Sequence, residues 1–256
     1  MTLHIERVGK GPNLVLLHGW ALNSGIWRTY LPTLTQHYCV HLVDLPGHGV
    51  NHAETLAPDV TVTAAQLIEA LPAQSHWLGW SLGGTVALAA ALIDPAAVNK
   101  LMLVATTPRF VATDTWPHGL PRATFELFAQ QLEDDYESTL KRFLALQALG
   151  LPHAQHLITQ LTRHVLERPQ PALTTLRNGL AVLNNTDLVA HVPRIVQPTL
   201  IMHGNKDRLI PFSAGQYLAT HIAHAQLVPF ANAGHAPFLG HDDVFLRAIQ
   251  DFLHDD

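Results

Sequence analysis

The chain has 256 residues, 48% of them hydrophobic and 14% charged, which is typical of a packed globular domain and excludes a disordered chain. Its formal net charge of −5 argues against a nucleic-acid partner, and its single cysteine, Cys39, excludes an internal disulfide. There is no signal region, and no apolar run reaches the roughly 18 residues that span a bilayer. We therefore expect a cytoplasmic protein that has no membrane contact.

Short apolar runs, each followed by glycine and then by a helical stretch, recur along the first part of the chain. They are Leu14–Leu17, Val40–Val43, Trp77–Leu78 and Lys100–Ala105. The same pattern returns near the end, with strands at Pro198–Met202 and Gln226–Phe230 and a closing helix at Asp243–His254. Continuous apolar strands that alternate with helices predict a mostly parallel central sheet with helices on both faces.

Between these two blocks, from about Pro108 to Asn185, the pattern is helical and carries no clear strand signal. Two amphipathic stretches stand out, Phe125–Leu132 and Thr139–Gln147. We predict an α/β core formed by residues 1–108 and 186–256, with an all-helical lid of residues 109–185 inserted into it. Such an insertion would cover the carboxyl ends of the strands, where open α/β sheets bind their ligands.

The segment Gly79-Trp80-Ser81-Leu82-Gly83 matches the pattern G-x-S-x-G. A predicted strand precedes it, and a helix rich in small residues, Thr85–Ile93, follows. In this context the pattern predicts a sharp strand-to-helix turn that lifts a serine hydroxyl above the sheet. The nucleophile's backbone is strained in such a turn, so the residues two positions away must be small. Ser81 is therefore the predicted nucleophile.

A helix that starts directly after Ser81 would also stabilise negative charge on a reaction intermediate, through its free N–H groups and its dipole. We predict the N–H of Leu82 as the first oxyanion donor. The loop His18-Gly19-Trp20 follows the earlier strand, and its glycine permits close approach, so the N–H of Trp20 is the predicted second donor. We expect His18 to brace this loop without a catalytic role.

A serine nucleophile needs a base, and the base needs an acceptor that fixes its tautomer. In this fold the chain order is serine, acid, histidine. Asp207 follows the strand that ends at Met202, and His235 lies in a small-residue loop after the last strand. We predict a Ser81–His235–Asp207 triad that transfers acyl groups and needs no metal or organic cofactor. The competitors are less well placed: His203 precedes the loop, and Asp187 and Asp242 do not follow a predicted strand.

Several stretches that span nearly the whole chain resemble the pimeloyl-[acyl-carrier-protein] methyl ester esterases of biotin biosynthesis, which are α/β hydrolases. The matching stretches are Leu16–Trp20, His41–Gly47, Trp77–Gly84, Arg142–Gln147 and Ala233–Phe238. The resemblance implies a serine carboxylesterase that hydrolyses the methyl ester of pimeloyl-acyl-carrier protein, which docks at the lid. It also implies substrate contacts from Trp20, Ser81, Leu82, Phe143, Leu144, Ala145, Leu146, Gln147 and His235.

Aromatic residues at Trp20, Trp80 and Phe143 would give an apolar tunnel for a seven-carbon chain; alternatively, the Phe143 segment is only the packed face of a lid helix. The charge pattern departs from that of the family, whose lid arginines meet the acidic carrier protein. Lys141 and Arg142 are present, but residues 152–160 have no basic side chain and residues 133–137 are strongly acidic. Electrostatic steering toward the carrier protein would then be weaker, or would rely on Arg122, Arg163 and Arg168.

Other functions remain open at this stage. The same triad serves broad-specificity short-chain carboxylesterases, thioesterases and C–C bond hydrolases. A protein of another class, which binds a ligand on a hydrolase fold with little turnover, would keep the fold, and so would a docking protein whose esterase activity is incidental. We expect a monomer.

Overall fold

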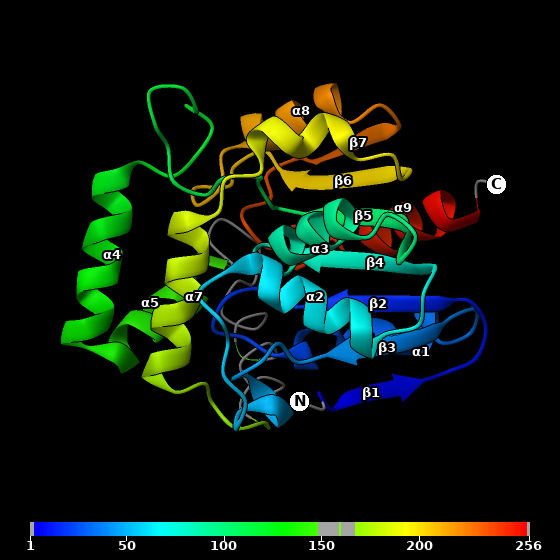
Figure 1. The fold of residues 1–256 in the computed structure, drawn as a ribbon, viewed down its shortest axis with the longest axis horizontal. Helices are drawn as coiled ribbons and strands as arrows, with labels where there is room; N and C mark the ends of the chain where they lie inside the picture. The colour runs from blue at the N-terminus through cyan, green and yellow to red at the C-terminus, as the bar shows by residue number, and fades with distance from the viewer. Residues whose placement is uncertain (1–2, 148–158, 160–166, 255–256) are drawn as a thin grey trace.

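The computed structural model describes residues 3–147, 159 and 167–254, without the side chains of residues 140, 141 and 144–147. The described residues form one seven-stranded sheet in the order β1-β3-β2-β4-β5-β6-β7 (Figure 1). Its strands are β1 (Ile5–Val8), β2 (Asn13–Leu17), β3 (Cys39–Val43), β4 (Ser75–Trp80), β5 (Val98–Val104), β6 (Thr199–Gly204) and β7 (Ala225–Phe230). The strand pairs are parallel from β3 to β7, which confirms the predicted fold class.

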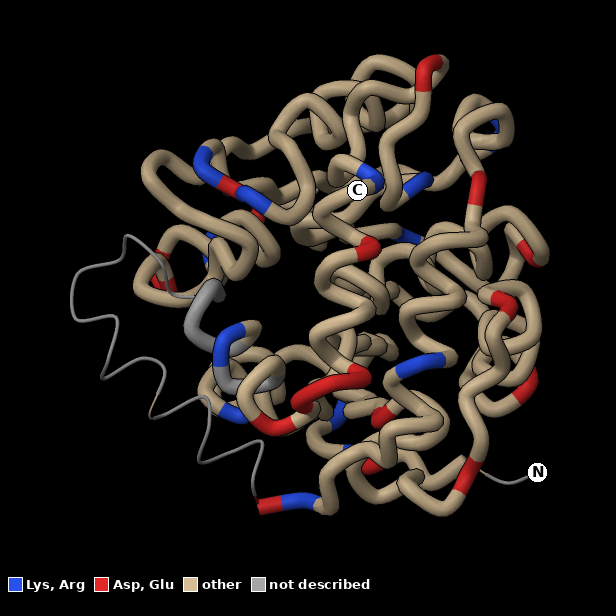
Figure 2. The backbone as a smooth tube through the Cα atoms, turned by 90° about the vertical axis from the view of Figure 1, so that its left-hand side faces the viewer, with Lys and Arg blue, Asp and Glu red and all other residues tan. Residues whose placement is uncertain are grey.

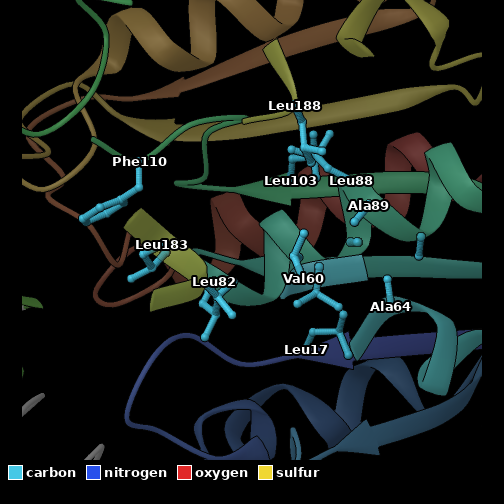
Figure 3. Packing of buried hydrophobic residues seen from close by; sticks show 14 of the residues in the cluster. Leu17, Val60, Ala64, Leu82, Leu88, Ala89, Leu103, Phe110, Leu183 and Leu188 are labelled. Atoms are coloured by element: carbon cyan, nitrogen blue, oxygen red, sulfur yellow. The ribbon is translucent and has the colours of Figure 1, made fainter. Parts of the chain in front are cut away.

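Alternate residues of each central strand face opposite layers, which explains why the strands are apolar throughout. In β2, Val15 and Leu17 join the core under α2 (Val60–Ala70), α3 (Leu82–Ile93) and α8 (Phe212–His221). Leu14 and Leu16 join the opposite core, under η1 (Ser24–Tyr30), α1 (Leu31–Leu34) and α9 (Asp242–His254). Figure 3 shows the first core, where Leu17 lies near Val60, and Leu88 lies near Leu103, between the sheet and its helices.

The inserted helices lie apart from both layers. α4 (Arg122–Asp134), α5 (Tyr136–Gln147) and α7 (Leu173–Asn185) stand beyond the carboxyl ends of the parallel strands, at the left of Figure 1. Of the inserted segment that the structure describes, only isolated bridges pair as β structure, Val111 with Leu120 and Thr113 with Trp116. Short 3-10 turns, η2 (Gly49–Asn51) and η3 (Val189–Arg194), lie in the core part of the chain.

The structure adds or corrects several elements. β1 was not predicted from the sequence; it is a short, half-buried edge strand that pairs antiparallel with β3. α3 begins at Leu82 and not at Thr85, so its first turn directly follows Ser81. Within the described residues, no helix combines the length and the apolar character that crossing a membrane requires.

Candidate active site

Ser81 stands in a strained turn between β4 and α3. Its backbone has φ 55° and ψ −118°, a left-handed conformation that is costly for a residue with a side chain. Two hydrogen bonds hold the turn: the Ser81 N–H donates to the Val104 carbonyl at 3.0 Å, and the Thr106 hydroxyl donates to the Ser81 carbonyl at 2.7 Å. The predicted strain at the nucleophile is thus confirmed.

The glycines beside Ser81 are required by close backbone contacts. A Cβ at Gly79 would overlap the Gly83 carbonyl, and a Cβ at Gly83 would lie 2.5 Å from the His18 carbonyl oxygen. Both contacts involve backbone, which cannot move aside. The small residues predicted on either side of the nucleophile are therefore explained by how closely α3 approaches β4 and the end of β2.

The side chains of Ser81, His235 and Asp207 form one hydrogen-bonded chain. The Ser81 hydroxyl donates to His235 Nε2 at 2.8 Å, and His235 Nδ1 donates to Asp207 Oδ2 at 2.8 Å. His235 is 2% exposed and Ser81 5% exposed, so the chain is almost shielded from bulk water. The loops after β4, β6 and β7 bring these residues together, although 154 positions separate Ser81 from His235. This is the arrangement in which a histidine can take the proton of an attacking hydroxyl.

Asp207 is held as an anion. Its Oδ1 accepts hydrogen bonds from the N–H groups of Leu209 at 2.8 Å and Ile210 at 3.0 Å. His203 Nε2 donates to the Ile210 carbonyl at 2.9 Å and also lies 3.5 Å from Asp207 Oδ2. Burial alone would raise the pKa of the Asp207 carboxyl, but the adjacent His235, assisted by His203, keeps that pKa well below its usual range. His203, which we did not assign to the site, therefore contributes beside the acid.

The competing acids of the sequence analysis lie in other settings. Asp187 forms an ion pair with Arg109, and both side chains are partly exposed. Asp242, at the start of α9, accepts a hydrogen bond from the Tyr30 hydroxyl. Of the three acids compared, Asp207 is the one hydrogen-bonded to His235.

Trp80 does not line a tunnel, and this part of the prediction was wrong. Its side chain is fully buried in the core on the α9 side of the sheet, because it precedes Ser81 on β4 and faces away from the cavity. Its indole N–H donates to the His235 carbonyl at 2.8 Å. The role visible in the geometry is to hold the histidine loop.

The loop after β2 lies against the nucleophile. A tight turn is closed by the Leu22 N–H, which donates to the Gly19 carbonyl at 3.3 Å, and Ala21 within it has φ 64°. A Cβ at Gly19 would lie 3.3 Å from the Ser81 Cβ, so glycine is what lets the loop come this near. Trp20, the predicted oxyanion donor, is next in the chain.

His18 braces this loop as expected. Its Nδ1 donates to the Gly19 carbonyl at 2.8 Å, and its Nε2 accepts the Leu45 N–H at 2.9 Å. These two bonds require a neutral ring, and burial indeed lowers the pKa of His18. The ring of His48 packs beside it, with centroids 5.0 Å apart. Burial also lowers the pKa of His48, to about 3.

Asp44 joins the same loops to the part of the insertion that precedes α7. Its carboxylate accepts the N–H groups of Ser24 at 2.7 Å and Val50 at 2.8 Å, and it pairs with Arg168 at 2.5 Å. Arg168 also pairs with Glu6 at 2.6 Å. Burial would raise the pKa of Asp44, but His18, these amides and Arg168 lower it overall. Because Arg168 is buried in this network, it is not available for docking, contrary to the prediction.

A narrow cavity of about 120 Å³ opens onto Ser81 and His235. Its other walls are almost entirely apolar and come mainly from the insertion: Trp20, Phe110, Leu120, Thr124, Phe125, Phe128, Phe143, Leu180, Leu183 and Leu209. The sequence analysis identified Trp20 and Phe143 and missed the remaining walls. The i, i+3 spacing of Phe125 and Phe128 in α4 and of Leu180 and Leu183 in α7 could have revealed these inward faces.

The other predicted substrate contacts are Phe143, Leu82 and residues 144–147. Phe143 lines the cavity and also packs edge-on against Trp20, with centroids 5.0 Å apart. The Leu82 side chain is buried in the core (Figure 3), so any contact would come from its N–H. The side chains of Leu144, Ala145, Leu146 and Gln147, like all of Arg163, lie outside the described residues. Among the residues that are described, no cluster of histidine, cysteine and acidic side chains is arranged to hold a metal.

Comparisons with known proteins agree with the geometry of the site. The family described as alpha/beta hydrolase fold matches residues 12–242. The pimeloyl-[acyl-carrier protein] methyl ester esterase of Xanthomonas axonopodis pv. citri is 43% identical over 252 residues, 98% of each chain. Its counterpart from Vibrio parahaemolyticus is 40% identical over 99% of each chain. The solved esterase of Exiguobacterium antarcticum has a TM-score of 0.89 and 27% identity, covering 98% of this chain and 95% of its own.

Proposed function

The chain belongs to the α/β hydrolase family and, within it, to the pimeloyl-[acyl-carrier protein] methyl ester esterases, and from that premise we propose how it acts. It hydrolyses the methyl ester of a pimeloyl chain carried on acyl carrier protein and releases methanol and the free carboxylate. The observation that carries the proposal is the hydrogen-bonded chain from Ser81 through His235 to Asp207, which opens on an apolar cavity.

The reaction proceeds in two acyl-transfer steps. His235 takes the Ser81 proton as the hydroxyl oxygen attacks the ester carbonyl, and Asp207 stabilises the charged ring. The N–H groups of Trp20 and Leu82 hold the oxyanion, since Leu82 begins α3 and its N–H has no acceptor within the helix. The protonated His235 gives its proton to the departing methoxy group, which leaves as methanol. Water, activated by the same histidine, then releases the acid.

The apolar walls suit the methylene chain of the substrate. Phe125 and Phe128 of α4, Phe143 of α5 and Leu180 of α7 surround the space above Ser81. Each methylene removed from water against such walls contributes about 0.8 kcal/mol to binding. Residues 109–185 act as the lid that supplies these walls.

Carrier protein docks on the lid, but charge steers it only weakly. Figure 2 views this side of the molecule, where basic and acidic segments are interspersed. Arg142 is exposed on α5. Arg122 is about half exposed but lies 3.9 Å from Glu126. Paired charges attract an acidic partner less than an isolated basic patch does, so the acyl chain supplies most of the recognition. The proposal includes a cytoplasmic, monomeric enzyme.

The first test replaces the nucleophile. Ser81→Ala should abolish hydrolysis of short p-nitrophenyl esters and of pimeloyl-carrier methyl ester, with kcat lower by a factor on the order of 10⁶, without loss of the fold. A fluorophosphonate probe should label the wild-type protein and not the variant. Near-normal turnover by Ser81→Ala contradicts the mechanism.

The second test concerns the substrate. Methyl pimeloyl-carrier protein and free monomethyl pimelate are compared by kcat/KM at low and moderate salt. A preference for the carrier-bound ester supports the proposal. Equal rates on both, together with equal rates on unrelated short esters, indicate the broad-specificity carboxylesterase that the mixed charges of the lid favour.

A further inference from the structure

The indole of Trp20 lies against α7. Its Nε1–H donates to the carbonyl oxygen of Leu176 at 3.0 Å, and the whole residue is 2% exposed. The hydrogen bond joins residues that are 156 positions apart. A loop residue whose backbone N–H serves the oxyanion is therefore fixed, through its side chain, to a helix of the insertion.

Gly179 makes room for this ring. A Cβ at Gly179 would lie 2.7 Å from Trp20 Cδ1 and 2.9 Å from Trp20 Nε1, closer than van der Waals contact allows. Glycine is unfavourable in the middle of a helix, and α7 carries it where the indole meets the helix. The ring is rigid, and Phe128 at 5.4 Å and Phe143 at 5.0 Å between centroids pack against it edge-on, so it cannot simply swing aside.

The loop itself needs such support. Trp20 lies in the turn closed by the bond from Leu22 N–H to the Gly19 carbonyl, and the next residue, Ala21, has a left-handed φ of 64°. A residue with a side chain keeps this conformation only where its surroundings enforce it. The contact between the Trp20 indole and α7 is one interaction that keeps the loop in this conformation.

We infer that α7 positions the oxyanion hole: Gly179 and the Leu176 carbonyl are positioning groups that set the Trp20 N–H through its indole. The inference rests on the proposed esterase function. An oxyanion donor acts in the transition state more than in the substrate complex, so its displacement lowers kcat and changes KM little.

The experiment is a double-mutant cycle between Gly179→Ala and Trp20→Ala, because alanine lacks both ring atoms, Cδ1 and Nε1, that meet Gly179. In the wild-type background Gly179→Ala should lower kcat for p-nitrophenyl butyrate about ten- to a hundredfold with KM nearly unchanged. In the Trp20→Ala background the same change should have an effect of less than about twofold, since the ring that Gly179→Ala would displace is gone.

A second readout reports on the oxyanion directly. With an alkyl trifluoromethyl ketone, the Ser81 oxygen adds to the carbonyl carbon, its proton passes to His235, and the carbonyl oxygen becomes the oxyanion. Gly179→Ala should weaken inhibition by the ketone by the same factor as kcat. Asn184→Ala, an alanine elsewhere on α7, is the matched control and should change both values by less than about twofold.

The outcomes separate clearly. An equal loss from Gly179→Ala in both backgrounds, or an unchanged kcat in the folded variant, overturns the inference. If Gly179→Ala does not fold, Trp20→Ala alone decides: it retains the backbone N–H but loses both side-chain contacts with α7, and unchanged kcat and ketone inhibition overturn the inference. Activity that survives Ser81→Ala overturns the proposed function instead, so the two failures are distinguishable.

Discussion

The two halves of the active site are built differently. The acid–base half, Asp207 and His235, comes from loops that follow neighbouring strands of the sheet, and backbone amides two and three residues along the chain fix its acid. The oxyanion half, around Trp20, depends on Leu176 of α7 and, through Asp44, on Arg168 in the part of the insertion that precedes α7. In the proposed mechanism, proton transfer is thus prepared by loops of the sheet, whereas charge stabilisation at Trp20 depends on the insertion.

The largest effect is expected in the half built from the sheet. Asp207→Asn should lower kcat for p-nitrophenyl esters by about 10⁴-fold, because an amide favours the wrong tautomer of His235. Asp187→Asn is the matched control, since Asp187 forms a partly exposed ion pair with Arg109 away from the triad. Comparable losses from both variants would remove Asp207 from its assigned role.

A smaller effect, on stability, is expected where the insertion meets the oxyanion half. Arg168→Met leaves Asp44 buried without its cation and should lower the free energy of unfolding by about 3–5 kcal/mol, measured by urea titration. The control Arg177→Met removes a solvent-exposed pair with Glu133 and should change stability little. If the two variants are equally stable, the ion pair of Asp44 does not join the insertion to the loops as described.

The smallest effect near neutral pH is a dependence of stability on pH, which grows as the solution becomes more acidic. Burial lowers the pKa of His48 in the folded protein from 6.5 to about 3. Below pH 6.5, His48 is therefore protonated in the unfolded chain but stays neutral in the folded protein. Stability should then fall by about 1.4 kcal/mol per pH unit for this residue until the pH approaches 3. His48→Gln should flatten the curve between pH 6.5 and pH 4 by about one proton, measured by urea unfolding at several pH values.

The range from pH 6.5 to pH 4 also distinguishes the acid–base half of the site from the oxyanion half. Asp207 has a depressed pKa, so its stabilising contribution is fully present above its unfolded pKa of about 3.9 and is lost only as the pH falls further. Between pH 6.5 and pH 4 the contribution of Asp207 is constant, while that of His48 declines. An unchanged slope in His48→Gln would contradict the assignment of this sensitivity to the oxyanion half.

The residues of the triad could be predicted because local signals mark them. Ser81 lies in a motif whose glycines are required by close backbone contacts. Asp207 and His235 each follow a strand, in the order that the fold requires. The orientation of Trp80 could not be predicted, because the face toward which a strand residue points depends on register. β1 was missed because a four-residue, half-buried edge strand has almost no periodic signal.

Contacts across the chain were beyond sequence reasoning for another reason. Nothing near Trp20 indicates that its partner is a carbonyl on a helix 156 positions later, and nothing near Gly179 indicates which ring it admits. Likewise, Arg168 looks like a surface cation until its burial against Asp44 and Glu6 is seen. Such pairs arise from tertiary packing, so no characteristic spacing in the sequence marks them.

α7 touches the core at several points besides Trp20. Asn178 Nδ2 donates to the Leu56 carbonyl at 2.9 Å, and Gly47 has no room for a side chain because Thr175 lies against it. Anyone who grafts the cap of another hydrolase onto this scaffold therefore replaces a helix that is fitted to two loops, the one after β2 and the one between β3 and α2. A chimera designed to broaden the choice of ester would have to carry over residues 175–179 with the scaffold, or else redesign those loops to match the donor helix.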